Sequence, residues 1–398
     1  MDRLLKTFRP APVLLGLGEP THGMEEFPRL RNQIFMHLVR RHGYLSIAVE
    51  SDCLAAAAVD DYVTTGTGDL EHVLASGFSH GFGASPANRD LITWLKEHNA
   101  AQSPERKVRF YGFDAPLEMT STPSPRAALL TAHAYLVEHL PAHRITCNAE
   151  TLDALLGDDT PWTNPAAMLD HTQSVGNTRQ ARALRLVADD ILTVYESEVP
   201  TLLKATSDSA FHRAHAQART ARGLLRYHAA MASASPERVA VMLGLRDSMM
   251  ADNLLAIAAA EARRGPCLVF AHNAHLQRHR SSWNWEAAGL DLHWWSAGAL
   301  TASSALGDRY AFIATDFADA ADLGDDADPQ TRGESSLQHV LARATSGQAL
   351  FPAIPLTAAL ANREGLHART DPARPGYFPL DPTELGGLDA VAFLTLPG

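Results

Sequence analysis

The stretch Val13-Leu14-Leu15-Gly16-Leu17-Gly18-Glu19 decides the fold class. It is a short apolar run that stops at a carboxylate, which is typical of a strand buried on both faces of a sheet. Residues 27–42 follow with apolar side chains at helical spacing, and Gly43 is suited to ending that helix. A buried strand followed by an amphipathic helix predicts an α/β fold with a parallel sheet.

The same alternation recurs along the chain. Further strands are expected over 44–49, 107–113, 267–271, 292–295, 310–315 and 390–396, and a helix over 91–98. The segments 316–333 and 361–387 are rich in small, acidic or proline residues and are predicted to be surface loops. The sequence therefore predicts a mostly parallel central sheet flanked by helices.

A helix-rich block separates the two groups of strands. Its composition is rich in Ala, Leu, His and Arg, and helices are expected over 126–140, 177–203, 209–232 and 248–264. Such a block is most simply an insertion between two parts of one sheet. We therefore expect a discontinuous α/β catalytic domain, residues 1–125 and 236–398, with an α-helical insertion or cap at 126–235.

Composition excludes several classes of protein. With 45 acidic and 34 basic residues, the net charge of −11 disfavours nucleic acid and anionic membranes as partners. No apolar run reaches the roughly 18–20 residues that cross a bilayer, and Gly16 and Gly18 interrupt the one that would serve a cleaved signal peptide. The widely spaced Cys53, Cys147 and Cys267 fit a reducing compartment, so we expect a cytoplasmic protein.

Chemically capable side chains gather where the predicted strands end. They are Glu19, Glu50, Asp114 and His272 at the strand ends, with His22 and His275 in the loops that follow. Because ligands bind beyond the carboxyl ends of parallel strands, we expect these groups to meet at one edge of the sheet. Carboxylates and imidazoles gathered there can perform general acid–base catalysis near neutral pH.

Other interpretations of these residues remain open. Each carboxylate could instead cap a helix, and His272-x-x-His275 could ligate a metal with Glu19 or Glu50. Because that spacing in a loop is weak support, we predict no metal. Gly77-Phe78-Ser79-His80-Gly81 matches the Gly-x-Ser-x-Gly pattern, but no strand pattern precedes it, so we expect a glycine-rich loop and not a nucleophile elbow.

Four segments together resemble the erythromycin esterase family in order and separation. They are Gly18-Glu19-Pro20-Thr21-His22-Gly23, Ala48-Val49-Glu50-Ser51, Phe110-Tyr111-Gly112-Phe113-Asp114 and Ala271-His272-Asn273-Ala274-His275. Arg31, nine residues after His22, and Arg246-Asp247-x-x-Met250 match further positions of that family.

The resemblance implies a hydrolase that opens a macrolactone-type ester without a metal, a cofactor or a covalent serine intermediate. It makes His22 the general base that removes a proton from water, with Glu50 holding or polarising His22 or that water. Glu19 and His272 would line the site and handle the leaving group. Arg31 would orient a carboxylate or stabilise the developing oxyanion.

Departures from the family's pattern concern the substrate. The segment 77–83, where relatives often carry a tryptophan, has Phe78, His80 and Phe82 instead. Trp283 and Trp285 are predicted to build an apolar wall, whereas Trp294 and Trp295 are expected to pack in the core. The predicted binding set also includes His275, Asp114 and Arg246.

The expected partner is a small molecule, largely apolar and of cyclic or cationic character. An enzyme of this kind would serve macrolide antibiotic resistance or natural product biosynthesis. Two alternatives stay open at this point: a tailoring enzyme of the same fold that cyclises or dehydrates a natural product or peptide, and a metal- or cofactor-binding protein that uses the histidine cluster. The sequence does not indicate an oligomeric state.

Overall fold

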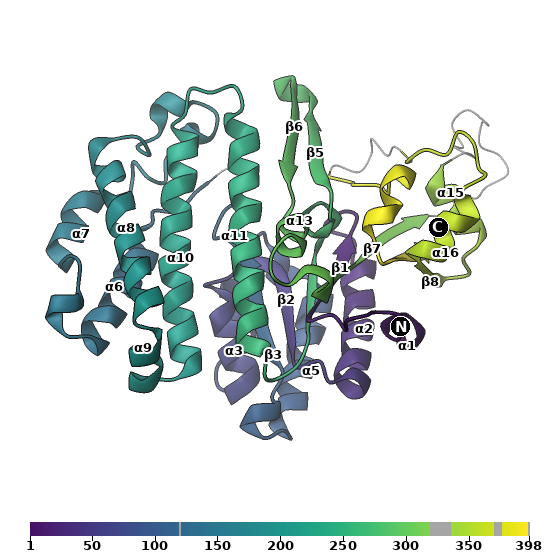
Figure 1. The fold of residues 1–398 in the computed structure, drawn as a ribbon, viewed down its shortest axis with the longest axis horizontal. Coiled ribbons are helices and arrows are strands. Elements are labelled where there is room, and N and C mark those ends of the chain that lie inside the picture. The colour runs from purple at the N-terminus through teal and green to yellow at the C-terminus, as the bar shows by residue number, and fades with distance from the viewer. Residues whose placement is uncertain (119–120, 319–335, 370–375, 397–398) are drawn as a thin grey trace.

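A seven-stranded sheet in the order β3-β2-β4-β1-β7-β9-β8 forms the centre of the protein (Figure 1). The computed structural model describes residues 1–118, 121–318, 336–369 and 376–396. The strands of the sheet are β1 (Leu14–Glu19), β2 (Ser46–Asp52), β3 (Arg109–Asp114), β4 (Cys267–His272), β7 (Tyr310–Ala318), β8 (Gln348–Pro352) and β9 (Ala390–Thr395). All neighbours run parallel except β8, which is antiparallel to β9. The predicted α/β fold with a mostly parallel sheet is confirmed.

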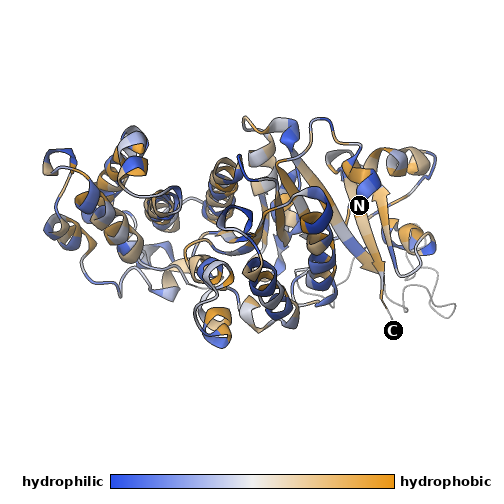
Figure 2. Ribbon diagram, turned by 90° about the horizontal axis from the view of Figure 1, so that it is seen from below, coloured by the Kyte–Doolittle hydropathy of each residue, from blue (hydrophilic) through white to orange (hydrophobic). Residues whose placement is uncertain are grey.

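Strand β1 shows why the opening stretch is so apolar. All six of its residues are buried, because it lies between β4 and β7 and helices cover both faces of the sheet. Leu15 and Leu17 pack into the hydrophobic core on one face, and Leu14 packs into the core on the other. Figure 2 shows hydrophobic residues concentrated on these central strands.

Helices flank the sheet. One core contains side chains from α1 (Asp2–Leu5), α2 (Glu26–His42), α3 (Ala56–Thr65), α4 (Leu70–Ser76) and α5 (Pro86–Ala100). The other contains side chains from α11 (Arg238–Glu261), α12 (Asn273–Leu276), α13 (Ala297–Ala302), α15 (Leu337–Arg343) and α16 (Ala353–Leu360). Gly43 ends α2 in the left-handed conformation at φ 70°, as its position predicted.

The middle of the chain forms a group of helices beside the sheet, on the left in Figure 1. They are α6 (Arg126–His139), α7 (Ala149–Leu156), α8 (Arg179–Ser197), α9 (Val199–Ala205) and α10 (Asp208–Met231). These helices bury a hydrophobic cluster of their own, and α10 packs against α11, which in turn packs against β3. We propose on this basis that 126–235 is inserted into the α/β domain.

Several predicted boundaries were wrong. The helix expected over 177–203 is two helices, because Pro200 lacks the N–H that would continue α8 and lies instead in the first turn of α9. Helix α11 begins at Arg238, ten residues before the expected start. The strand expected at 292–295 belongs to a separate antiparallel hairpin of β5 (Arg280–Trp285) and β6 (Leu290–Trp295).

The predicted loops also need correction. Residues 316–318 continue β7, and the rest of the loop predicted to 333 lies outside the described residues. Within 361–387, residues 382–387 form a 3-10 helix. Among the described helices, none is long and apolar enough to cross a membrane.

Candidate active site

The strand order places the predicted strand-end residues next to one another. β3, β2, β4 and β1 are neighbours, and Asp114, His272 and Glu19 end three of these strands at one edge of the sheet. Glu50 lies at the same edge but does not end its strand as predicted, because β2 continues to Asp52 through an irregularity in its pairing with β3. Glu19 and His272 are directly paired in register. The end of β1 lies so close to the Asn273 side chain that position 18 must be glycine, because a Cβ there would lie 2.0 Å from Oδ1 of Asn273. That edge is the candidate active site.

His22 projects from the loop after β1 and is the accessible imidazole of the site. Its Nδ1 lies 2.7 Å from Oε1 of Glu19, and its Nε2 lies 3.7 Å from Oε1 of Glu50. The His22 side chain is 41% exposed, whereas both carboxylates are buried. Nδ1 is therefore held by Glu19, while Nε2 lies beyond hydrogen-bond distance of Glu50.

The two carboxylates differ in their affinity for a proton. Burial raises the pKa of Glu19, and its hydrogen bond with His22 only partly opposes that effect. Burial also acts on Glu50, but the charges of His275, His22 and Arg246 hold its pKa well below the ordinary value. Burial by itself lowers the pKa of His22, yet Glu50 and Glu19 together raise it above the ordinary 6.5. The site thus pairs an ionised Glu50 with a basic imidazole.

A buried network supports Glu50 from the side away from the cleft. Nε2 of His275 lies 3.3 Å from Oε1 of Glu50, and its Nδ1 lies 2.9 Å from Oδ1 of Asp247. Asp247 also accepts hydrogen bonds from the indole N–H of Trp294 at 2.7 Å and the backbone N–H of Ala297 at 2.8 Å. Burial lowers the pKa of His275, but Asp247 and Glu50 together raise it to about 10. His275 is therefore a fixed cation beneath the site.

Arg246 joins the strand ends of β2 and β3. Its guanidinium donates to Glu50 at 3.2 Å and to both oxygens of Asp114, the shortest bond being 2.6 Å. On the other side of Asp114, Nε2 of His80 lies 3.1 Å from Oδ2, while Nδ1 of His80 lies 2.9 Å from Glu118. Burial opposes ionisation of Asp114, but Arg246 and His80 lower its pKa. Arg246 therefore links the carboxylates of Glu50 and Asp114, and His80 contacts Asp114 from its other side.

The geometry of His272 argues against the metal-ligand alternative. Its Nε2 donates to the carbonyl of Gly376 at 3.0 Å, and its Nδ1 accepts from the backbone N–H of Ala274. Both nitrogens are occupied by protein groups, and burial lowers the pKa of His272 to about 3, so it is neutral. His275 likewise uses both nitrogens on carboxylates. Such a pair has no lone pair free for a metal, and no described histidine and acid of this edge meet the spacing of a three-ligand cluster.

A cleft of about 500 Å³ opens beside His22, a size typical of sites for drug-sized ligands. Glu19, Glu50, Arg31, Phe78, His80 and Phe82 are among the residues that line it. Arg31 on α2 stacks over the Phe270 ring at 4.9 Å and donates from Nε and Nη2 to Asn32. Burial lowers the pKa of Arg31 to about 10, so it is still a cation at neutral pH.

The segment 77–83 forms one wall of the cleft. The Phe82 ring lies 5.1 Å from His22 and 5.6 Å from His80, and Phe78 is buried against Phe110. Residues 77–81 connect α4 to a short 3-10 helix that begins at Phe82, so the expected loop is confirmed. Within this loop the Ser79 hydroxyl accepts a hydrogen bond from the backbone N–H of Asp52. His80 has φ 55°, a conformation that non-glycine residues rarely adopt and that is over-represented at functional sites.

The tryptophans occupy a different place. Trp283 and Trp285 stack on each other, with centroids 5.1 Å apart, on the β5–β6 hairpin and are not among the residues that line the cleft. Trp294 is buried, as predicted, and serves as a donor to Asp247. The prediction for Trp295 was wrong: it is 54% exposed, because burial alternates along β6 and Trp294 occupies the buried face.

Sequence reasoning missed Asp247 as a site residue. Asp247 belongs to the motif Arg246-Asp247-x-x-Met250, but it lies inside helix α11. A search for polar residues at the ends of predicted strands therefore does not find it. Its position directly after Arg246 was the available signal. Glu118 and the carbonyl of Gly376 were also missed, since loop residues give no periodic pattern.

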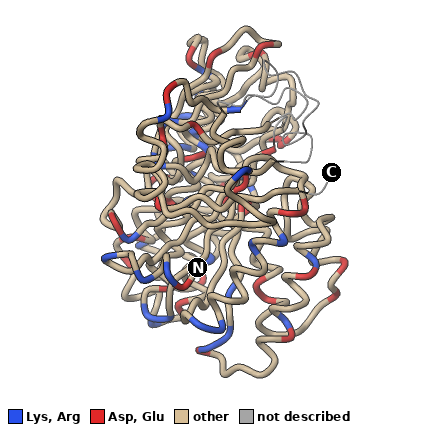
Figure 3. The backbone as a smooth tube through the Cα atoms, turned by 90° about the vertical axis from the view of Figure 1, so that its right-hand side faces the viewer, with Lys and Arg blue, Asp and Glu red and all other residues tan. Residues whose placement is uncertain are grey.

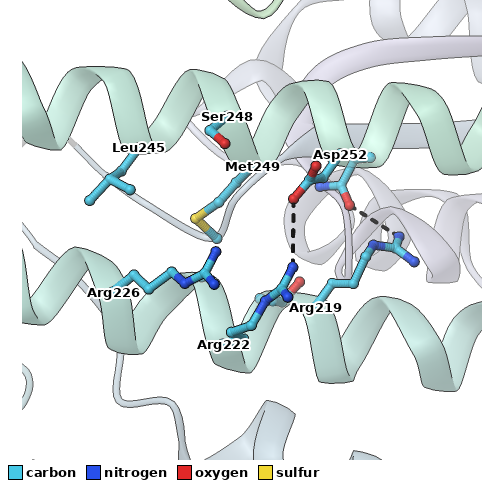
Figure 4. A pocket seen from close by; sticks show the side chains of 10 residues that line it. Arg219, Arg222, Arg226, Leu245, Ser248, Met249 and Asp252 are labelled. Atoms are coloured by element: carbon cyan, nitrogen blue, oxygen red, sulfur yellow. Dashed lines mark hydrogen bonds and ion pairs between the residues drawn. The ribbon is translucent and has the colours of Figure 1, made fainter. Parts of the chain in front are cut away.

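A second hollow lies between α10 and α11 (Figure 4). Arg219, Arg222 and Arg226 line one side of it. Arg219 donates to Asn253 at 3.2 Å, and Arg222 lies 3.9 Å from Asp252. Its volume of about 20 Å³ has room for about one water molecule, so it is too small for an organic substrate.

Fold and site together define an α/β protein with a histidine between two carboxylates at the carboxyl edge of a parallel sheet. The sequence profile of the erythromycin esterase family matches residues 39–378, and the chain belongs to that family. It is 30% identical over 129 residues to erythromycin esterase type I from Escherichia coli. That match covers 32% of this chain and 29% of the relative.

Solved structures share the fold. A protein from Bacillus cereus has a TM-score of 0.68 at 18% identity, over 96% of this chain and 88% of its own. A succinoglycan biosynthesis protein has a TM-score of 0.66 at 15% identity, over 100% and 90%. A mutant of the erythromycin esterase EreC in its open conformation has a TM-score of 0.66 at 19% identity, over 98% and 92%.

Proposed function

We propose that this protein is a hydrolase that cleaves an ester bond, of the macrolactone type, with water activated by His22. The observation that carries the proposal is the placement of His22, which lines the cleft with Nδ1 on Glu19 and Nε2 3.7 Å from Glu50. Membership of a family named for an esterase supports the reaction class.

The first step needs a base that can accept a proton from water. When Nδ1–H donates to Glu19, the lone pair of neutral His22 is on Nε2. The distance of 3.7 Å from Nε2 to Glu50 is too long for a direct hydrogen bond, which suits a water molecule shared between the two groups. As His22 takes the proton, the two carboxylates stabilise the imidazolium.

The attack places hydroxide on the ester carbonyl carbon and negative charge on its oxygen. Arg31 is among the residues that line the cleft, and as a cation it would stabilise this oxyanion or orient a carboxylate. When the tetrahedral intermediate collapses, the C–O bond breaks and the leaving alkoxide takes the proton from Nε2 of the His22 imidazolium, while the Glu19 carboxylate still accepts the Nδ1–H. The products are a carboxylic acid and an alcohol, and His22 is again neutral.

The cleft favours an apolar substrate with a positively charged group. Phe78, Phe82 and Phe270 supply its apolar surface, and Glu19, Glu25 and Glu50 supply negative charge. A macrolide that carries an amino sugar has both properties. Ser79 takes no covalent part in the proposed reaction, since its hydroxyl is bound to Ser51 and to the backbone of Asp52.

The test is a mass-spectrometric screen of macrolides and simple lactones with the wild-type protein and His22→Ala. We expect a product heavier by one water with the wild type and little or none with the variant. A product lighter by one water would instead indicate a dehydrating enzyme. Turnover that is unchanged in His22→Ala would remove His22 as the base.

A further inference from the structure

A second cluster of histidine and carboxylate lies where α1 meets the end of α2. Nε2 of His37 is 2.5 Å and Nε2 of His42 is 2.8 Å from the same oxygen, Oδ1 of Asp2. The three ligand atoms lie within 4.8 Å of one another. The side chains are 26–58% exposed, so an ion from solvent can reach all three.

We propose that Asp2, His37 and His42 form a binding site for a divalent transition-metal ion such as Zn²⁺. Imidazole nitrogen and carboxylate oxygen are the ligands that Zn²⁺ takes in proteins, and three protein ligands leave one position for water. Ligand atoms around a tetrahedral Zn²⁺ lie roughly 3.3 Å apart, so the two nitrogen–oxygen distances of 2.5 and 2.8 Å must lengthen by about 0.8 and 0.5 Å when the ion enters.

The surroundings favour a transition metal over Ca²⁺ or Mg²⁺. Arg40 and Arg41 lie in the same last turn of α2 and oppose the approach of any cation, and basic segments are visible near the N-terminus in Figure 3. Binding must therefore come from coordinate bonds to nitrogen, which Ca²⁺ and Mg²⁺ do not favour. The carbonyl end of α2 carries partial negative charge, which also favours a cation at this site.

The ion would join two elements and would take no part in the proposed hydrolysis. Arg31 faces the cleft from the same helix, eleven residues before His42, a separation of roughly 16 Å along the axis. Asp2 opens α1, whose Leu4 is buried in the core beside α2. Metal binding should therefore stabilise the docking of α1 on α2.

Calorimetric titration of untagged, metal-free protein with Zn²⁺ tests the proposal. We expect one site in the wild type, with affinity at least ~10-fold weaker in Asp2→Asn, His37→Ala and His42→Ala. Zn²⁺ should raise the melting temperature of the wild type and leave that of His42→Ala unchanged. His72→Ala, an exposed histidine on α4, is the matched control and should bind as the wild type does.

Two further measurements separate this site from the catalytic histidines. Zn²⁺ binding that is retained in His22→Ala and lost in His42→Ala supports the proposal, and Mg²⁺ should not compete. The absence of binding heat at micromolar Zn²⁺, or affinity unchanged in both His37→Ala and His42→Ala, would overturn it and leave the cluster as a hydrogen-bonded clamp. Far-ultraviolet circular dichroism confirms that each variant is folded.

Discussion

Glu50 separates two regions built from the same residue types. On the cleft side, His22 lies between Glu19 and Glu50 and is 41% exposed. On the buried side, His275 lies between Asp247 and Glu50 and is 9% exposed. Each imidazole has two carboxylate neighbours, yet only the first has a nitrogen free to exchange a proton.

The difference shows that surroundings and not residue type assign the roles. His275 makes hydrogen-bond contacts at both nitrogens and has a pKa of about 10, so it remains charged throughout a catalytic cycle near neutral pH. His22 has one nitrogen at 3.7 Å from its second carboxylate and can be neutral before the reaction and charged after it. The buried pair keeps Glu50 ionised, and Glu50 in turn favours the charged form of His22.

The most severe test of this comparison is His22→Ala. Loss of the general base is expected to lower kcat by ~10³-fold, within the range measured for general-base residues. Steady-state hydrolysis of the ester identified in the screen measures it, with His72→Ala as the control. A kcat reduced as much by His275→Ala alone, with His22→Ala unaffected, would reverse the assignment of the two histidines.

Glu50→Gln is expected to have the next largest effect, a fall in kcat of ~10²-fold. The amide keeps the shape of the side chain but removes the charge that stabilises protonated His22 and balances His275 and Arg246. Kinetics and urea unfolding should both report the change. Full activity in a folded Glu50→Gln protein would contradict the role of Glu50.

Asp247→Asn should lower kcat by ~10-fold, because the buried network acts on the reaction only through His275 and Glu50. We also expect a loss of unfolding free energy of about 1–3 kcal/mol from the weakened buried hydrogen bonds. Asp252→Asn, on the same helix and with an ion pair at 3.9 Å to Arg222, is the matched control. Equal effects of the two substitutions would show that Asp247 has only a general structural role.

A smaller effect is expected on the pH dependence of kcat/KM, which reports the titration of His22. The base must be neutral, so activity is lost as the pH falls through the pKa of His22, which Glu50 and Glu19 raise above 6.5. Glu19→Gln removes one of these charges and should move the acid limb of kcat/KM to lower pH. A limb that does not move would mean that a group other than His22 titrates.

The smallest effect is expected from Trp283→Ala. Trp283 and Trp285 stack on the hairpin and do not line the cleft, so KM should stay within about twofold of the wild-type value. Phe82→Ala, at the cleft wall beside His22, is the comparison and should raise KM further. A larger increase in KM with Trp283→Ala than with Phe82→Ala would indicate that Trp283 contacts the substrate, as expected from the sequence.

The residues on the cleft side of Glu50 were predictable from the sequence, whereas most of the buried network around His275 was not. Apolar runs ending at Glu19, Glu50 and His272 placed those residues at one edge, since parallel strands end together. Asp247 gave no such signal, because its partners Trp294 and Ala297 come from segments some 50 residues away that only the folded chain brings near. The antiparallel strand β8 was missed for a similar reason: its partner among the described strands, β9, comes from a later segment of the chain.

The segment around Gly376 has a consequence for how the protein is made. The carbonyl of Gly376 fixes His272, and the backbone N–H of Phe378 donates to Pro20 in the loop that carries His22. A ribosome must therefore synthesise the chain at least as far as Phe378 before the loop that carries His22 can receive this hydrogen bond. Nascent chains released before residue 376 would have every proposed catalytic side chain and still have an incomplete site.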